Sequence, residues 1–179
     1  MDQLDLIPKT WKYCNNAKIR QIRDEIWDEA TRLGYTKGME KPIIWTFKSA
    51  YRWGEDRYHT NSPTGTIGIE RIFLKAPDAA RETIIHEMAH LFTKGEHHSE
   101  KWEKVGNELG KLYNISISRC DDSDEIGIDA NLLDYHVKCK HCGKIYHWPE
   151  QTKSWKFPER FSCGYCGGAL ERYEMSKNS

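Results

Sequence analysis

Two Cys-x-x-Cys pairs restrict the possible fold of this chain more than any other feature of its sequence. They read CKHC at 139–142 and CGYC at 163–166. Each pair places two thiolates on one tight turn, and the glycine that follows lets the backbone curl so that amides point at sulfur. Four thiolates complete a tetrahedron, so the spacing predicts a structural zinc site and not a pair of disulfides. The expected ligands are Cys139, Cys142, Cys163 and Cys166.

The distribution of charge predicts how the chain is divided. Its 179 residues carry 27 basic and 27 acidic side chains, which argues against a wholly basic nucleic-acid binder. Residues 118–135 contain one base and six acids, whereas residues 136–179 contain eight bases and four acids. We therefore expect a larger domain at 1–117, an acidic connector at 118–135 and a zinc ribbon at 136–179. Zinc binding is worth on the order of 10–16 kcal/mol, enough to fold such a ribbon with little core.

The sequence gives no sign of a membrane or of export. No apolar run approaches the roughly 20 residues that span a bilayer. The first residues, MDQLDLIPKTW, lack the charged-then-apolar pattern of a secretion signal. We expect a cytoplasmic protein, or a nuclear one in a eukaryote, that is not secreted and has no membrane partner.

Local patterns predict helices at 16–33, from Pro77 to about Lys94, and at 100–113. Asn15 or Asn16 can cap the first helix, Gly34 can end it, and Ser99 is the expected cap of the third. The third helix should bury one face made of Trp102, Val105, Leu109 and Leu112. Strands are expected at 41–47, at 51–59 and, with a bulge, at 66–74, and NSPTG at 61–65 is expected to be a turn.

The second helix carries HEMAH at 86–90, inside the stretch TIIHEMAHLF. His86 and His90 are four residues apart, so both imidazoles lie on one face of a helix and can bind one zinc ion. Glu87 lies about 100° further round, where it can reach a water on the metal and take its proton. The pattern predicts a catalytic zinc site with Glu87 as the base. The competing interpretation is a pair of surface or satisfied core histidines.

A catalytic zinc ion usually has three protein ligands and one open position. His97 and His98 follow the turn at Gly95, and either can complete the site if the chain folds back beside the helix. Glu103 or Glu108 is a further alternative, which needs more rearrangement.

Basic and aromatic residues alternate through the ribbon, as on surfaces that bind single-stranded nucleic acid. The candidate contacts are Lys144, Trp148, Lys153, Trp155, Lys156 and Arg160. The competing interpretation is that the rings form the ribbon's own core and the lysines keep it soluble. His141 and His147 are expected to be exposed, since four cysteines already fill the zinc site.

Together these motifs resemble the SprT-like metalloprotease family, the Spartan-type enzymes, over residues 16–173. The resemblance rests on a hairpin-like β segment, IIHEMAH, HSEKW at 98–102 and the ribbon YHVKCKHCG…FSCGYCGG. It implies an α+β fold with a small zincin-like domain, in which helices pack on a short antiparallel sheet, followed by the zinc ribbon. It also implies that His86, His90 and His98 bind the catalytic zinc and that Glu87 is the base. Ser99 stands where the family often has glycine.

The resemblance further implies a zinc endopeptidase that cleaves proteins bound or crosslinked to DNA, as in DNA repair. Its partners would be protein substrates and DNA with single-stranded features, held by the ribbon. Two alternatives remain: a non-catalytic nucleic-acid-binding zinc protein, and a peptidase whose ribbon only supports the catalytic domain.

Overall fold

The computed structural model describes residues 7–58, 63–117 and 127–175, which form two compact units. The first unit comprises Met1–Lys48 and Arg52–Ile126, and the second comprises Ser49–Tyr51 and Gly127–Ser179. The expected acidic connector spans the change from one unit to the other. Its residues 118–126 lie outside the described residues.

The first unit is built on a four-stranded mixed sheet with the strand order β1-β2-β4-β3. The strands are β1 (Lys12–Tyr13), β2 (Glu40–Phe47), β3 (Gly54–Arg57) and β4 (Thr64–Glu70). The expectation of an antiparallel sheet is wrong for its centre, because β2 and β4 run parallel. β4 lies between β2 and β3, and this central position accounts for the burial of every one of its residues. The hairpin-like pair expected from the sequence is β3 with β4, which run antiparallel.

The strand expected at 66–74 is also wrong in its second half. β4 ends at Glu70, whose carboxylate accepts a hydrogen bond from the N–H of Ile72 and caps a 3₁₀ helix at Arg71–Leu74. This change from strand to helix explains why the alternation of apolar residues shifts phase within 66–74. That shift is interpreted as a bulge in the sequence analysis.

The irregularity in the sheet lies in β2, between Glu40 and Ile43. Pro42 is inside it, where a residue without an N–H costs no ladder hydrogen bond. The expected turn at 61–65 is partly wrong, since Thr64 and Gly65 belong to β4, and residues 61–62 lie outside the described residues.

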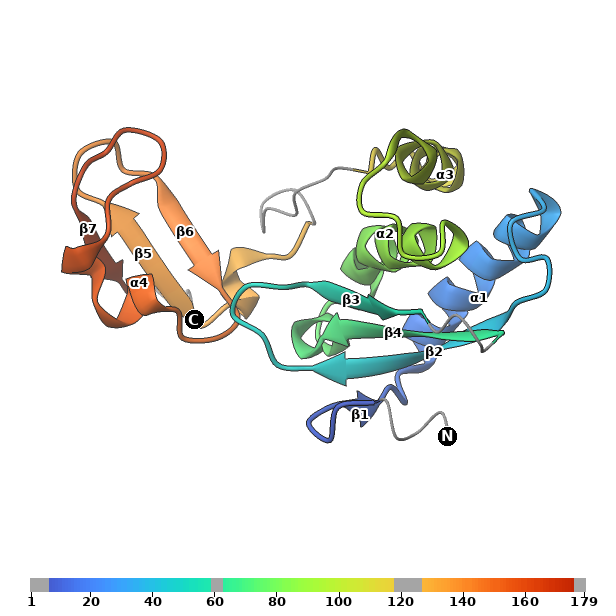
Figure 1. The fold of residues 1–179 in the computed structure, drawn as a ribbon. Coiled ribbons are helices and arrows are strands. Elements are labelled where there is room, and N and C mark those ends of the chain that lie inside the picture. The colour runs from blue at the N-terminus through green and yellow to red at the C-terminus, as the bar shows by residue number, and fades with distance from the viewer. Residues whose placement is uncertain (1–6, 59–62, 118–126, 176–179) are drawn as a thin grey trace. The chain divides into compact units, whose positions relative to one another are not determined.

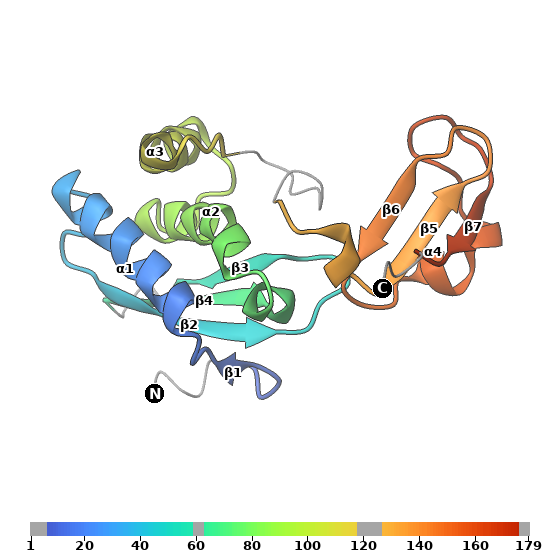
Figure 2. The same cartoon turned by 180° about the vertical axis from the view of Figure 1, so that it is seen from behind.

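Three helices cover the sheet of the first unit: α1 (Ala17–Arg32), α2 (Ala80–Phe92) and α3 (Glu100–Gly110). Figures 1 and 2 show α1 and α2 on the same face of the sheet, and α3 on the side of α2 that is turned away from the sheet. α2 is therefore enclosed, and its residues from Thr83 to Leu91 are all buried. A short 3₁₀ helix at Pro77–Ala79 leads into α2, with Pro77 in its first turn as expected.

The predicted helix ends are mostly confirmed. The side chain of Asn16 accepts from Ile19 N at 3.1 Å, and that of Ser99 accepts from Trp102 N at 3.2 Å. Gly34 follows α1 with a φ of 85°, a conformation that favours glycine. The prediction for Leu112 is wrong: α3 ends at Gly110, and Leu112 is 52% exposed in the 3₁₀ turn that follows.

The second unit has a three-stranded antiparallel sheet with the order β6-β5-β7. The strands are β5 (Tyr135–Cys139), β6 (Ile145–Trp148) and β7 (Leu170–Tyr173), and α4 is a short helix at Lys153–Lys156. Val137, Cys139, Cys163 and Leu170 form its buried core. Two of these four residues are expected zinc ligands, so the apolar part of this core is small.

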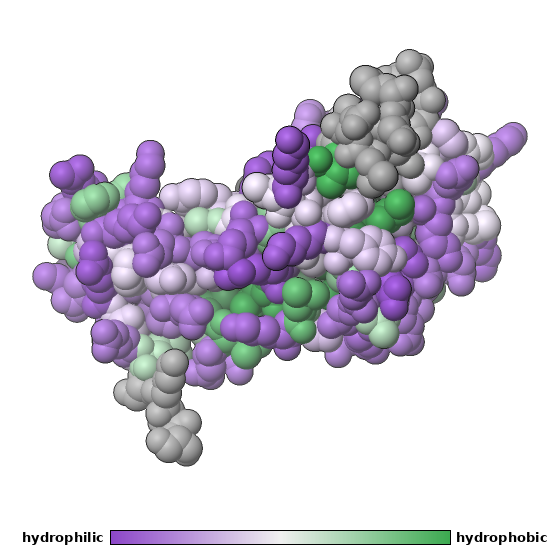
Figure 3. Space-filling view, turned by 90° about the horizontal axis from the view of Figure 1, so that it is seen from below, coloured by the Kyte–Doolittle hydropathy of each residue, from purple (hydrophilic) through white to green (hydrophobic). Residues whose placement is uncertain are grey.

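Most of the surface in the space-filling view of Figure 3 is hydrophilic, with hydrophobic residues in smaller patches. Among the described residues, no helix has the length and apolar character needed to cross a bilayer.

Candidate metal centres and active site

The enclosed helix α2 carries three polar side chains that an ordinary core helix would not have. His86, Glu87 and His90 are 7%, 5% and 5% exposed. Apolar residues of the same helix, Ile84 and Ile85 among them, are fully buried and pack it into the core. Burying ionisable groups is costly unless they are paired or bind a metal, so their place on α2 calls for a ligand or a partner.

The turn after α2 brings His98 back to the helix. Three residues of this turn have positive φ: Lys94 at 59°, Gly95 at 77° and His98 at 45°. Such values are uncommon outside glycine, and they reverse the chain within a few residues. The side chains of His86, His90 and His98 meet there as one group of possible metal ligands. His97 is exposed, with its ring centroid 5.9 Å from that of His90.

The spacing of the three imidazoles fits a zinc ion. Nε2 of His86 lies 3.3 Å from Nε2 of His90 and 3.3 Å from Nε2 of His98. Nitrogens bound at about 2.0–2.1 Å in a tetrahedron are separated by about 3.3 Å, which matches both distances from His86. All three ligand nitrogens lie within 4.8 Å of one another, so they can share one ion. Three imidazoles leave the fourth corner of a tetrahedron open, as in catalytic zinc sites.

His90 is held in the orientation and charge state that metal binding needs. Its Nδ1 lies 3.0 Å from the carbonyl oxygen of Glu96, so Nδ1–H can donate to that oxygen and leave the Nε2 lone pair free for the metal. Burial lowers the pKa of His90, which favours the neutral imidazole. A neutral ring is the form that binds zinc.

Trp102 of α3 forms one wall of the histidine cluster. Its ring centroid lies 4.7 Å from that of His86, 5.2 Å from His90 and 4.5 Å from His98, and the side chain is fully buried. Because Ser99 caps α3 one turn before Trp102, the serine at this position fixes the start of the helix that supports the imidazoles.

The edge strand β3 passes beside α2. Its first residue, Gly54, lies against the carboxyl group of Glu87. Two residues further on, burial raises the pKa of Asp56 to about 6, and the nearby His97 opposes that rise. Gly54 and Asp56 are not singled out in the sequence analysis. A glycine inside a predicted aromatic strand marks close approach of another group, and this signal was available in YRWGEDRYH at 51–59.

The second candidate metal centre is in the ribbon and consists of the four expected cysteines. Sγ of Cys142 lies 3.7 Å from that of Cys163, and Sγ of Cys139 lies 3.5 Å from that of Cys166. Thiolates at about 2.3 Å from zinc in a tetrahedron are separated by about 3.8 Å, so these residues also fit the ion. Four sulfurs fill its coordination sphere, as in a structural site.

Hydrogen bonds favour the thiolate forms of two of these cysteines. The Tyr146 hydroxyl lies 3.2 Å from Sγ of Cys163 and lowers the pKa of that thiol to about 6. The backbone N–H of Cys142 points at Sγ of Cys139 at 3.5 Å and lowers its pKa. Gly143 has a φ of 77° directly after its cysteine pair, as the knuckle turn requires.

The expectation that His141 and His147 are exposed is half wrong. His141 is exposed, but His147 is half-buried on β6, opposite His136 of β5. Their Nδ1 atoms are 2.8 Å apart, so one ring donates to the other across the strands. Burial lowers the pKa of His136.

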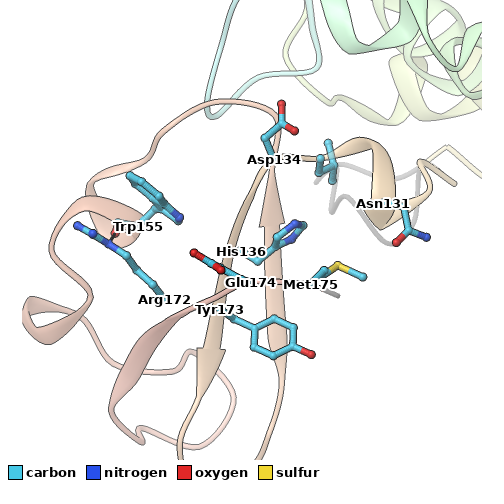
Figure 4. A pocket seen from close by; sticks show the side chains of 9 residues that line it. Asn131, Asp134, His136, Trp155, Arg172, Tyr173, Glu174 and Met175 are labelled. Atoms are coloured by element: carbon cyan, nitrogen blue, oxygen red, sulfur yellow. Dashed lines mark hydrogen bonds between the residues drawn. The ribbon is translucent and has the colours of Figure 1, made fainter. Parts of the chain in front are cut away.

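Figure 4 shows an open pocket of the second unit, with His136 at its centre and Trp155 beside Arg172 on one wall. The volume is about 1060 Å³. The guanidinium of Arg172 lies 4.5 Å from the Trp155 ring centroid and donates to the carbonyl of Trp155 at 2.8 Å. The lining residues are Asn131, Leu133, Asp134, His136, Trp155, Arg172, Tyr173, Glu174 and Met175.

The candidate nucleic-acid residues fall into two groups. Trp148 and Trp155 pack partly against the ribbon core, which supports a structural role for these rings. The cations Lys144, Lys153, Lys156 and Arg160 are exposed. Aromatic side chains outside the candidate set are more accessible: Phe157 is 45%, Phe161 41% and Tyr165 80% exposed.

Comparison with known families agrees with the histidine geometry. A family model described as the SprT-like family matches residues 18–121, which include all but the first residue of α1, strands β2, β3 and β4, and helices α2 and α3. A search of curated proteins gives no match.

Proposed function

Because this chain belongs to the SprT-like family, we propose that it is a zinc-dependent endopeptidase that cleaves proteins associated with DNA. One observation carries the proposal: the ligand nitrogens of His86, His90 and His98 lie within 4.8 Å of one another, and Glu87 is buried on α2 between the first two of these histidines. A zinc ion bound there supplies Lewis-acid chemistry at an open fourth position.

The residues around this position have separate tasks in the proposed reaction. His86, His90 and His98 bind and orient the ion. The Glu87 carboxylate accepts the proton of the attacking water and returns it to the leaving amine nitrogen as the peptide bond breaks. Enclosure of α2 between the sheet and α3 keeps Glu87 largely away from bulk water, since the side chain is 5% exposed. In such a site, fixed charges act more strongly than they do in water.

The ribbon supports the DNA part of the proposal. Exposed cations of α4 and the following turn lie near exposed rings in sequence, and Arg160 stacks on Phe157 at 4.8 Å. Cations attract phosphates, and accessible rings can stack on unpaired bases. The pocket of Figure 4 is lined by the acidic residues Asp134 and Glu174 as well as by Trp155 and Arg172. This mixture suits a polar planar base more than a phosphate.

The catalytic proposal is tested with Glu87→Gln in the full chain. The amide keeps the size of the side chain but cannot accept the proton, so cleavage should fall about 10²- to 10⁴-fold. Zinc content should stay at two ions per chain. Cleavage of a basic DNA-binding protein is measured with and without single-stranded DNA. Glu82→Gln, which lies on the same helix and outside the histidine cluster, is the matched control and should cleave normally. Equal rates for Glu87→Gln and the wild type would show that Glu87 is not the base.

The DNA proposal is tested with the double variant Lys153→Ala and Lys156→Ala. Both lysines are exposed on α4, and removing a cation that neutralises a phosphate should reduce the salt dependence of single-strand binding. The slope of log K against log salt should fall by about 1.4 if both lysines bind phosphates. Lys104→Ala with Lys111→Ala removes the same charge from the first unit and should leave the slope unchanged.

Two results would favour the alternatives. DNA binding without any cleavage by the zinc-loaded wild type would indicate a non-catalytic nucleic-acid-binding zinc protein. Cleavage without DNA binding would indicate a peptidase whose ribbon only supports the catalytic unit.

A further inference from the structure

At its first residue, β3 passes so close to α2 that a side chain larger than that of glycine would have to displace side chains of the helix. A Cβ on Gly54 would lie 2.3 Å from Oε1 of Glu87, 2.8 Å from Cδ of Glu87 and 2.7 Å from Cγ2 of Thr83. All three separations are well below van der Waals contact. Gly54 is not one of the glycines with positive φ, so its backbone conformation would accept other residues. The reason for glycine at this position is therefore space, and the Glu87 carboxyl group fills that space.

We propose that Gly54 is a positioning residue for Glu87, and that its missing side chain lets the carboxylate lie between α2 and β3. This inference rests on the proposed function, because it takes Glu87 as the base. Gly54 is fixed to the sheet by its antiparallel pairing with Ile69 of β4. Glu87 is fixed on α2 between two candidate ligands, His86 and His90. The approach of strand to helix thus sets the place of the carboxylate relative to the imidazoles.

The nearest atoms decide what an added methyl group would do. Two of the three belong to the outer end of the Glu87 side chain, which has rotatable bonds. Rotation of that side chain costs less than movement of a strand that is hydrogen-bonded to the sheet. Gly54→Ala should therefore move the carboxylate and leave the fold and the three imidazoles in place. A displacement of about 1 Å in a reacting group can cost about 10²-fold in rate.

The chain offers a matched control on the neighbouring strand. A Cβ on Gly65 of β4 would lie 2.6 Å from Cδ2 and 2.8 Å from Cδ1 of Leu91, which is also on α2. Gly65→Ala therefore crowds the same helix against the same sheet to a similar extent. The group that it displaces is apolar and outside the proposed site. Gly65→Ala should affect packing but not the carboxylate.

The kinetic test compares Gly54→Ala, Gly65→Ala and Glu87→Gln in the full, zinc-loaded chain. We expect Gly54→Ala to retain two zinc ions and to unfold at about the same temperature as Gly65→Ala. Its kcat should fall about 10²-fold while KM changes little, since only the base has moved. Equal losses of kcat in the two glycine variants would overturn the proposal and indicate general crowding.

Two double variants separate the contact with Glu87 from the contact with Thr83. Thr83→Ser removes the methyl group that lies 2.7 Å from the added Cβ. In the Gly54→Ala background it should improve packing without restoring kcat. Glu87→Asp withdraws the carboxylate from β3, so Gly54→Ala should cost less in that background than in the wild type. If Gly54→Ala reduces kcat by the same factor in the Glu87→Asp background as in the wild type, Gly54 does not act through Glu87.

A crystal structure of Gly54→Ala gives a readout that does not depend on activity. The Glu87 carboxylate should be displaced from β3 with all three histidines unmoved, and an unmoved carboxylate would overturn the inference. Failure of the proposed function is a different result: the wild type and Glu87→Gln would then cleave equally or not at all. If the wild type cleaves, Glu87→Gln is inactive and Gly54→Ala is fully active, the result contradicts only the positioning role of Gly54.

Discussion

At the scale of single residues, the candidate active site consists of buried polar side chains, and the cost of burying each one is offset only by its interaction with the others or with a shared metal. His86, Glu87 and His90 take positions on α2 where apolar side chains would pack at no cost. Their burial is compensated if the two imidazoles share a metal with His98. The backbone of His98 has a φ of 45°, an uncommon value that persists where the surroundings enforce it.

The choice of third ligand is testable by removing one histidine at a time. His98→Gly should reduce the zinc content of the full chain from two ions to one, because the cluster then has one nitrogen fewer. Glycine accepts the positive φ at this position, so no backbone strain is added. His97→Gly is the control and should keep both ions. Metal content is measured by elemental analysis after gel filtration, and two ions in His98→Gly would mean that another side chain completes the site.

The pair His136 and His147 predicts a pH dependence of stability. Burial lowers the pKa of His136 in the folded protein, so the unfolded chain binds a proton more readily. Unfolding then takes up protons, and the free energy of unfolding should fall as the pH drops below about 6.5, the pKa of an unfolded histidine. Urea unfolding at several pH values measures this. His136→Gln should flatten the dependence, and an unchanged slope would assign it to other groups.

At the scale of elements, structure that depends on one segment, such as a helix cap, can be predicted from the sequence. The pairing of strands from distant segments cannot. Asn16 and Ser99 lie directly before the helices that they cap, so the sequence around them contains the whole interaction. The parallel pairing of β2 with β4 depends on which strands meet in the folded chain. Alternation along one strand does not contain that information. The 3₁₀ helix after Glu70 interrupts the alternation of apolar residues in the same way as a bulge does, so the sequence pattern does not distinguish the two.

The same distinction holds for the candidate site. The motif at 86–90 places His86, Glu87 and His90 together, whereas the sequence alone leaves the third ligand open between His97, His98 and two glutamates. The fold of the turn after α2 brings His98 to the other two histidines. Gly54 reaches Glu87 from a strand far earlier in the chain, where no local pattern indicates the contact.

The cap of α3 connects an element to the site. Ser99→Ala removes the acceptor for Trp102 N and should lower the free energy of unfolding by about 1 kcal/mol. It should also weaken zinc binding slightly, because Trp102 packs on all three imidazoles. Urea unfolding and zinc titration measure the two effects. Ser116→Ala, which changes an exposed serine outside the helix, is the control and should alter neither.

At the scale of the whole molecule, the two units differ in what holds them together. The first has a large apolar core that includes Phe73, Ile84 and Trp102, all fully buried. The second has Val137, Cys139, Cys163 and Leu170, of which only two are not candidate ligands. Its stability should therefore depend on the metal, as in small zinc domains.

Removal of both zinc ions by a strong chelator should unfold the second unit and leave the first unit folded. Backbone amides of β5, β6 and β7 should lose their protection against hydrogen exchange, whereas those of α1 and β4 should keep it. Cys166→Ser should reproduce the loss in the second unit without a chelator. Protection of β5 that survives complete metal removal would show that the ribbon folds without its ion.

The local origin of the imidazoles has a consequence for a chain emerging from the ribosome. His86 and His98 are separated by only 12 residues, so closing that loop costs little entropy. All three candidate ligands leave the ribosome within a few residues of one another, and the strand that holds Gly54 has already emerged by then. The segment that would bind the ion is therefore complete as soon as His98 has been added.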